Sequence, residues 1–412
     1  MRYLKRLGWK RIVFILGILG PGIIGALAGN EAGGIATYSI AGAHFEYNLL
    51  WTMIPVTILL LIIQEMVARM GAVTGKGLSD LIRENFGIKI TFFIMIGLLI
   101  ANLFITVAEF AGIASVAGIF GVDKTILVIG TAILVWLFVL KLNYKFLEKF
   151  FLFIGLFYLI YIVSGIMAGP DWGVVLEKTF IPSFEFSPLF IGLFLAIIGT
   201  TVTPWMQFYL QSSVVEKGIR KEDYKYTKWD VIIGAVLTDV IAFFIIISTA
   251  AIIFPQGVQI ETATDAALAL EPVLGNSATL LFAIAFFAAA LFGAFLVPLS
   301  TSYYICEAFG WESGVNKKFK DAKVFYSLLT LIIIISAAIV LIPNLPLLTM
   351  ILSSQVINGI ILPMILIAIL VIVNKKEIMG SYTNPPWLNF LAWLATIVII
   401  ISTFLLFGTY LL

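Results

Sequence analysis

The chain has 412 residues, of which 61% are hydrophobic and 12% are charged, and its formal net charge is +2. A typical soluble domain is about 25% charged, so this composition excludes an ordinary soluble protein and is typical of a polytopic membrane protein. The basic residues are spread over many short loops, which argues against a nucleic-acid partner.

Apolar runs long enough to cross a bilayer recur along the chain, since one spanning helix needs about 20 apolar residues. We expect an all-α fold with about eleven spans in a single transmembrane domain, residues 1–412. The expected limits are roughly 14–42, 48–70, 90–119, 125–142, 147–168, 186–215, 229–254, 277–309, 324–342, 347–373 and 387–410.

The loops between these spans predict the orientation. Alternate loops carry 23 of the 25 Lys and Arg residues, and only Lys124 and Lys178 fall on the other side. Cytoplasmic loops are enriched in Lys and Arg. We therefore expect a multi-pass protein of the cell membrane with a cytoplasmic N-terminus and, after an odd number of spans, an extracellular C-terminus.

The first span contains Ala-Gly-Asn-Glu-Ala-Gly-Gly at residues 28–34, where Asn30 and Glu31 stand among small residues. Irregular backbone at membrane depth is tolerated only where it is buried in protein or lines a cavity. An ionisable residue there indicates function. The coincidence of the two features predicts a site for a transported cation.

The sixth span contains a second expected break, Gly-Thr-Thr-Val-Thr-Pro at residues 199–204, followed by Trp205 and Gln207. Proline lacks an N–H group and kinks or unwinds a helix. Paired broken spans in corresponding halves indicate a transporter site near the membrane midplane. The halves are expected at about 14–168 and 186–373, with an additional helix at 387–410.

These segments resemble the Nramp family of divalent-metal transporters. The first span from Gly20 to Thr37 matches in spacing the family segment that ends in Asp-Pro-Gly-Asn. Four further segments carry the resemblance: 74–83, 108–109, 199–213 and 354–363. The resemblance implies a LeuT-like fold of five plus five inverted-repeat helices, with unwound first and sixth helices and alternating access to a midplane site.

The departures from the family pattern alter the expected substrate. The family's Asp is Glu31 here, its Asn is Gly34, its Met is Thr203 and the following His is Trp205; Thr106 replaces an acid of proton-coupled members. Without the methionine thioether, the remaining candidate ligands are hydroxyl, carboxylate and water oxygens, which suit Mg²⁺ and Mn²⁺. Mg²⁺ usually keeps several waters, and we expect one at the space beside Gly34.

This combination is similar to the Nramp-related magnesium transporters, which implies uptake of partly hydrated Mg²⁺, with Mn²⁺ tolerated and without proton coupling. Glu31 is the expected ligand, either directly or through water. For the other residues, ordinary hydrogen bonding or packing is the alternative reading. The expected metal-site residues are Glu31, Asn30, Ala28, Thr200, Thr203, Gln207 and Gln355, and a pathway or gating role is expected for Glu109, Trp205 and Asp239.

Two other functions stay open at this point. One is a proton-coupled Mn²⁺ or Fe²⁺ transporter of the same fold, and the other is an amino-acid or organic-cation transporter. The sequence shows no nucleophile–base pair, nucleotide-binding loop or cofactor motif, so we expect no enzyme and no cofactor. The expected partners are a divalent cation and the lipid bilayer, and the chain is expected to function as a monomer.

Overall fold

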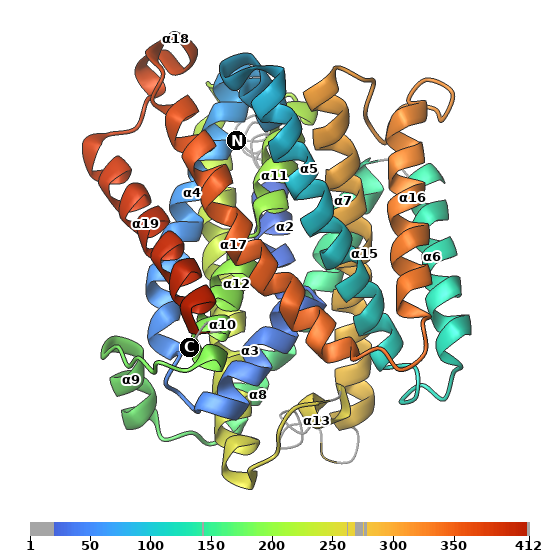
Figure 1. Cartoon of the computed structure of the whole chain (residues 1–412), viewed down its shortest axis with the longest axis vertical. Helices are drawn as coiled ribbons and strands as arrows, with labels where there is room; N and C mark the ends of the chain where they lie inside the picture. Colours follow the sequence, from blue (N-terminus) through green and yellow to red (C-terminus); the bar gives the residue numbers. More distant parts are fainter. Residues whose placement is uncertain (1–19, 142–143, 262, 268–274, 276–277, 410–412) are drawn as a thin grey trace, which may run out of the picture.

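A computed structural model describes residues 20–141, 144–261, 263–267, 275 and 278–409. Every regular element in these residues is a helix, as predicted (Figure 1). The elements in chain order, with η for 3-10 turns, are α2 (Pro21–Leu27), η1 (Ala28–Asn30), α3 (Ala32–Phe45), η2 (Leu50–Thr52), α4 (Met53–Thr74), α5 (Leu78–Ser115), α6 (Lys124–Lys141), α7 (Tyr144–Gly155), η3 (Leu156–Tyr158), α8 (Leu159–Met167), α9 (Trp172–Phe180), α10 (Pro188–Thr201), α11 (Pro204–Glu216), α12 (Tyr224–Ile252), η4 (Phe254–Gln256), α13 (Ala263–Ala267), α15 (Ala278–Phe309), α16 (Lys323–Val340), α17 (Leu347–Val373), α18 (Lys376–Met379), η7 (Gly380–Tyr382) and α19 (Pro386–Thr409).

Nine helices in the described residues are long and apolar enough to cross a membrane, or ten if a bent pair, Leu156–Met167 with Trp172–Phe180, counts as one span. The expected first span is divided between α2 and α3, and its first residues lie outside the described part. The expected fifth span is divided into α7, η3 and α8. The total of eleven therefore stays a prediction.

The third span begins earlier than predicted. We expected it to start near residue 90, but α5 starts at Leu78 and bends at Gly87, whose φ of 74° and ψ of 169° are not helical. Glycine adopts a positive φ without the steric penalty of a side chain. The first turns of α5 thus belong to the loop region that follows α4.

Large apolar side chains cover the outside of the bundle as well as its core. Phe93 of α5 is 72% exposed and Phe404 of α19 is 71% exposed. Exposed apolar surface on this scale is expected where the neighbouring solvent is lipid. The polar side chains needed for a site are instead buried, near the breaks in the first and sixth spans.

The loops predicted to be cytoplasmic meet at one end of the molecule. Figure 1 places α18 at this end and α9 and α13 at the opposite end. Gln211 donates to the Lys76 carbonyl, Arg83 to the Ala308 carbonyl and Lys375 to Asn85. These contacts join segments that the positive-inside rule assigns to the same face.

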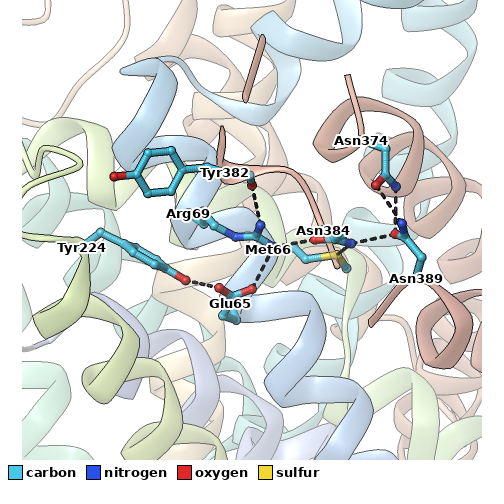
Figure 2. Close-up of polar contacts among 8 residues, drawn as sticks. All are labelled: Glu65, Met66, Arg69, Tyr224, Asn374, Tyr382, Asn384 and Asn389. Carbon is cyan, nitrogen blue, oxygen red and sulfur yellow. Dashed lines mark hydrogen bonds and ion pairs between the residues drawn. The ribbon is translucent and has the colours of Figure 1, made fainter. Parts of the chain in front are cut away.

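A buried polar network at this end is centred on Arg69 of α4 (Figure 2). Its guanidinium donates to the Tyr382 carbonyl, to Asn384 and to Glu65, with the last bond 3.0 Å long. The Tyr224 hydroxyl also donates to Glu65. The network therefore connects α4, the start of α12 and the segment before α19.

Candidate metal site

The first span is interrupted at its small residues. Helix α2 ends at Leu27, η1 covers Ala28–Asn30, and Glu31 is extended with a ψ of 179° before α3 begins. The Ala28 carbonyl accepts from the Glu31 N–H at 3.3 Å. The backbone therefore changes direction at Glu31, whose side chain is attached between the end of η1 and the start of α3.

Glu31 is completely buried, and neither of its carboxyl oxygens accepts a hydrogen bond within the described structure. Gln355 of α17 lies beside it. A buried acid with open lone pairs is unfavourable unless it is neutralised or bound to a cation. This arrangement fits the predicted role of Glu31 as the central ligand.

Glu109 of α5 lies at the start of α3. Its Oε2 accepts from the Ala32 N–H at 3.3 Å, while its Oε1 has no hydrogen-bond partner in the described residues. A carboxylate is stabilised by the positive end of a helix dipole. Glu109 therefore caps α3 from another helix and adds a second acid beside Glu31.

The break in the sixth span lies against the break in the first span. Helix α10 ends at Thr201 and α11 begins at Pro204. The Thr200 hydroxyl donates to the Gly29 carbonyl at 3.2 Å. Residues 171 positions apart in the chain are thus in direct contact at the candidate site.

Two polar side chains at the start of α11, Thr203 just before the helix and Gln207 within it, carry open acceptors near this break. Gln207 donates to the Thr203 carbonyl at 3.3 Å, which leaves the Gln207 Oε1 and the Thr203 Oγ1 without hydrogen-bond partners in the described part of the chain. Both residues are fully buried. They are therefore placed to accept hydrogen bonds from metal-bound water.

Two glycines of α3 allow close approaches. A Cβ at Gly33 would lie 1.9 Å from Gln355 Nε2, so only glycine admits this amide. A Cβ at Gly34 would lie 2.0 Å from the Gly29 oxygen. The expectation of a water at Gly34 was wrong, because the broken backbone folds back and its own carbonyl fills that space.

The remaining predicted residues lie around this centre. Asn30 donates to the Thr238 carbonyl of α12 at 3.0 Å and keeps its Oδ1 open. Trp205 is fully buried, and its carbonyl accepts from Ser300 of α15. Asp239 lies on α12 beside Thr57 of α4, next in sequence to Thr238, whose carbonyl accepts from Asn30 at the first break.

Asp230 of α12 was missed by the sequence analysis. Its two carboxyl oxygens accept from the N–H groups of Gly20 and Gly22 at 2.9 and 2.6 Å. Those amides begin α2, and no side chain of the first span caps them. The sequence offered one signal for such a residue: a helix starts within an apolar span, and no nearby side chain caps its free N–H groups.

A cavity of about 370 Å³ opens beyond the site on the α9 and α13 side of the molecule. It contacts α3 at Ile35 and Ala36, one turn from Ala32. Its other lining residues include Ser115, Glu261, Phe286 and Leu347. The cavity therefore approaches the candidate site along one face of α3.

The polar groups around Glu31 offer oxygen atoms. No group of three or more His, Cys, Asp or Glu side chains suited to a metal ion occurs in the described residues. Carboxylate, amide, hydroxyl and carbonyl oxygens favour Mg²⁺, Ca²⁺ and Mn²⁺.

Comparison with known proteins agrees with this geometry. A divalent metal cation transporter, MntH, of Caldanaerobacter subterraneus subsp. tengcongensis is 27% identical over 405 residues, which cover 95% of this chain and 93% of that protein. The manganese transporter of Eremococcus coleocola superimposes with a TM-score of 0.79 at 20% identity, over 94% of this chain and 85% of that chain. The nucleobase-cation-symport-1 transporter MHP1 matches with a TM-score of 0.58 at 14% identity, over 95% and 93%.

The two structural matches confirm the predicted all-α, LeuT-like fold. The named relatives are transporters, which agrees with the prediction that the chain is not an enzyme. The family described as natural resistance-associated macrophage protein-like, or Nramp, matches residues 22–409. The chain therefore belongs to the Nramp family.

Proposed function

We propose that this protein transports divalent metal cations across the cell membrane, and that its preferred substrate is partly hydrated Mg²⁺, with Mn²⁺ tolerated. The ion binds at Glu31 and is exposed alternately to the two sides of the membrane. One observation carries the proposal: Glu31 is buried with both carboxyl oxygens open, between the broken ends of two spans. The names of the MntH and manganese-transporter relatives support a divalent cation.

The lack of a soft ligand supports Mg²⁺ over the softer transition metals. Thr203 stands at the position of the family's methionine, and its hydroxyl oxygen is open. The methionine that α11 does contain, Met206, accepts from Gln64 of α4 at its sulfur, 2.9 Å away. That sulfur is therefore engaged with α4, while oxygen ligands favour a hard cation.

The presence or absence of side chains that can transfer protons distinguishes the proposal from its main alternative. The sixth-span histidine positions of the family are Trp205 and Gln211 here, and Thr106 donates to its own helix at the Asn102 carbonyl. None of these side chains gains or loses a proton near neutral pH, so none of them can relay one. We therefore propose transport without obligatory proton coupling. Glu109, with its open Oε1, is the observation that favours a proton-coupled Mn²⁺ or Fe²⁺ transporter as the second candidate.

The proposed orientation follows the charge of the loops. The segments with Lys76, Arg83 and Lys375 face the cytoplasm together with the N-terminus, and the C-terminus is extracellular. Each of the proposed ligands comes from this one chain. We therefore propose a functional monomer in the bilayer.

Purified protein in liposomes tests the proposal. The liposomes contain a Mg²⁺-sensitive dye and a pH dye, and Mg²⁺ is added outside. We expect Mg²⁺ to enter without acidification of the interior, and Glu31→Ala to abolish the influx because it removes the carboxylate. Glu177→Ala is a matched control, since that acid is exposed on α9 and does not line the cavity beside α3.

Three results would contradict parts of the proposal. Full Mg²⁺ influx in Glu31→Ala would remove the central ligand. Acidification that follows metal entry would favour the proton-coupled alternative. Influx of Mn²⁺ with no influx of Mg²⁺ would show that selection against Mg²⁺ survives without the thioether.

A further inference from the structure

Four acids buried in the spans differ in how their carboxyl oxygens are used. Asp230 accepts two backbone N–H groups, and Glu109 accepts one with a single oxygen. Glu31 and Asp239 accept none in the described structure. Asp239 is only 4% exposed, so it resembles the candidate metal ligand and not the two helix caps.

The surroundings of Asp239 offer oxygen atoms but no positive charge. Thr57 of α4 lies beside it, and the Thr57 hydroxyl donates to the Met53 carbonyl at 2.6 Å, which leaves its oxygen lone pairs available. The Thr238 Oγ1 on the same helix is also open. None of the ion pairs in the described residues includes Asp239.

The basic residues of the helices packed against α12 do not pair with Asp239: Arg69 of α4 pairs with Glu65, and His44 lies in the last turn of α3, six residues after Tyr38. From α3, Tyr38 lies within reach of the charge of Asp239, and Glu31 also interacts with Tyr38. The sequence of α2 contains no titratable side chain, and α8 contributes only Tyr161. A carboxylate in this setting needs a small cation or a proton to offset its charge.

We propose that Asp239 binds a singly charged cation, a proton or Na⁺, at a second site beside the metal site. The oxygen atoms around it suit both ions, and a single carboxylate balances one positive charge. This inference rests on the proposed function, because the second ion is detected through its effect on metal binding at Glu31.

Tyr38 links the two sites. Its hydroxyl shares a 2.6 Å hydrogen bond with Thr201 at the sixth-span break, and it lies close enough to both Glu31 and Asp239 to interact with their charges. An ionised Asp239 attracts a divalent cation at Glu31, whereas a neutralised Asp239 does not. Bound protons or Na⁺ therefore weaken metal binding, and by linkage bound metal weakens theirs.

The test measures the apparent KM for Mn²⁺ influx into liposomes that contain the purified protein. One arm varies pH in sodium-free buffer, equal on both sides, and the other varies Na⁺ at fixed pH and constant ionic strength. We expect the wild-type KM to rise either as the pH falls or as the Na⁺ concentration increases. The arm in which it rises identifies the ion. A carboxylate attracts a divalent cation at Glu31 twice as strongly as it attracts a single charge, so we expect a change of about tenfold or more.

Variants at Asp239 separate this site from Glu31. In Asp239→Asn and in Asp239→Ser we expect a raised KM that no longer responds to the second ion. Asp239→Glu keeps the charge and retains the response. The two neutral variants differ in size, so a folding defect in one leaves the other as a test.

Two outcomes overturn the inference. A wild-type KM that is constant in both arms shows that no such ion binds. An unchanged response in the neutral variants assigns the effect to Glu31 itself. Neither outcome affects the proposed function, which fails only in the Glu31→Ala and Mg²⁺ experiments described above.

Discussion

Single glycines decide how closely the ligands approach one another at the candidate site. Gly33 lies directly against the Gln355 amide, which in turn lies beside Glu31. The Gln355 side chain can thus lie against the α3 backbone because Gly33 has no Cβ. The geometry of the site depends on this contact as much as on the ligand itself.

Gly33→Ala therefore tests the contact. Its Cβ would lie 1.9 Å from Gln355 Nε2, so the amide must move away from Glu31. We expect a severalfold rise in the KM for Mg²⁺ influx. Gly25→Ala is the matched control in the same span, because its nearest neighbour would be 3.8 Å away and nothing needs to move. Equal KM values for the two variants would contradict the role assigned to Gln355.

Thr203→Met tests the selection between hard and soft metals. The substitution places a thioether at the open hydroxyl of Thr203, and thioethers favour soft or borderline metals over Mg²⁺. We expect the affinity for Cd²⁺ or Mn²⁺ relative to Mg²⁺ to rise by about tenfold. Thr203→Val, which adds no ligand, is the control. The relative affinities are measured by competition for influx into liposomes, and an unchanged ranking would place Thr203 outside the site.

The elements of the first span are held in place by one long helix. Asp230 of α12 binds the start of α2, and the Thr238 carbonyl of α12 accepts from Asn30 at the break. Gly22 and Gly234 bring the two backbones into contact between these points, because a Cβ at Gly22 would lie 2.6 Å from Val231 N. The broken span is therefore fixed to α12 on both sides of the break.

Asp230→Asn tests this attachment. The amide keeps one acceptor oxygen but loses the charge and one backbone hydrogen bond. Hydrogen bonds to charged groups contribute about 1.5–3 kcal/mol, so we expect the free energy of unfolding to fall by roughly 2 kcal/mol. Thermal unfolding of the purified protein measures the change.

Asp239→Asn provides the control on the same helix. The oxygens of Asp239 accept no hydrogen bond in the described structure, so we expect a much smaller loss of stability. Equal unfolding temperatures for the two variants would contradict the assignment of Asp230 as the cap of α2.

Local sequence predicted the break but not its attachments. Small residues around Asn30 and Glu31, and Pro204 in the sixth span, disfavour a continuous helix by local physics, and the structure interrupts both spans there. The bond from Gly20 to Asp230 joins positions 210 residues apart. No local pattern encodes such a pairing.

The whole molecule divides the site between two groups of helices. Glu31 and Asn30 belong to the first span, which packs on α12, whereas Glu109 and Gln355 come from α5 and α17. Helix α5 packs against both α15 and α17. Movement of one group relative to the other would separate the ligands of the site and open it to one side.

In the proposed orientation, the cavity on the α9 and α13 side is the outer route along α3. Ala36 lines this cavity, whereas Ala41 is fully buried and lies nearer the outer end of α3. Five residues rotate a helix by about 140°, so the two alanines point in different directions. If the cavity is the outer route, a reagent reaches the deeper position and not the shallower one.

Cysteine substitution makes this a direct test, because Cys306 is the only cysteine in the chain. In a Cys306→Ser background, Ala36→Cys and Ala41→Cys are treated from outside with a membrane-impermeant thiol reagent. We expect the reagent to block Mg²⁺ influx through the Ala36→Cys protein, to leave Ala41→Cys active, and to act more slowly when Mg²⁺ is present. Block of both variants, or of Ala41→Cys alone, would place the outer route on another face of α3, away from the cavity and from Glu31.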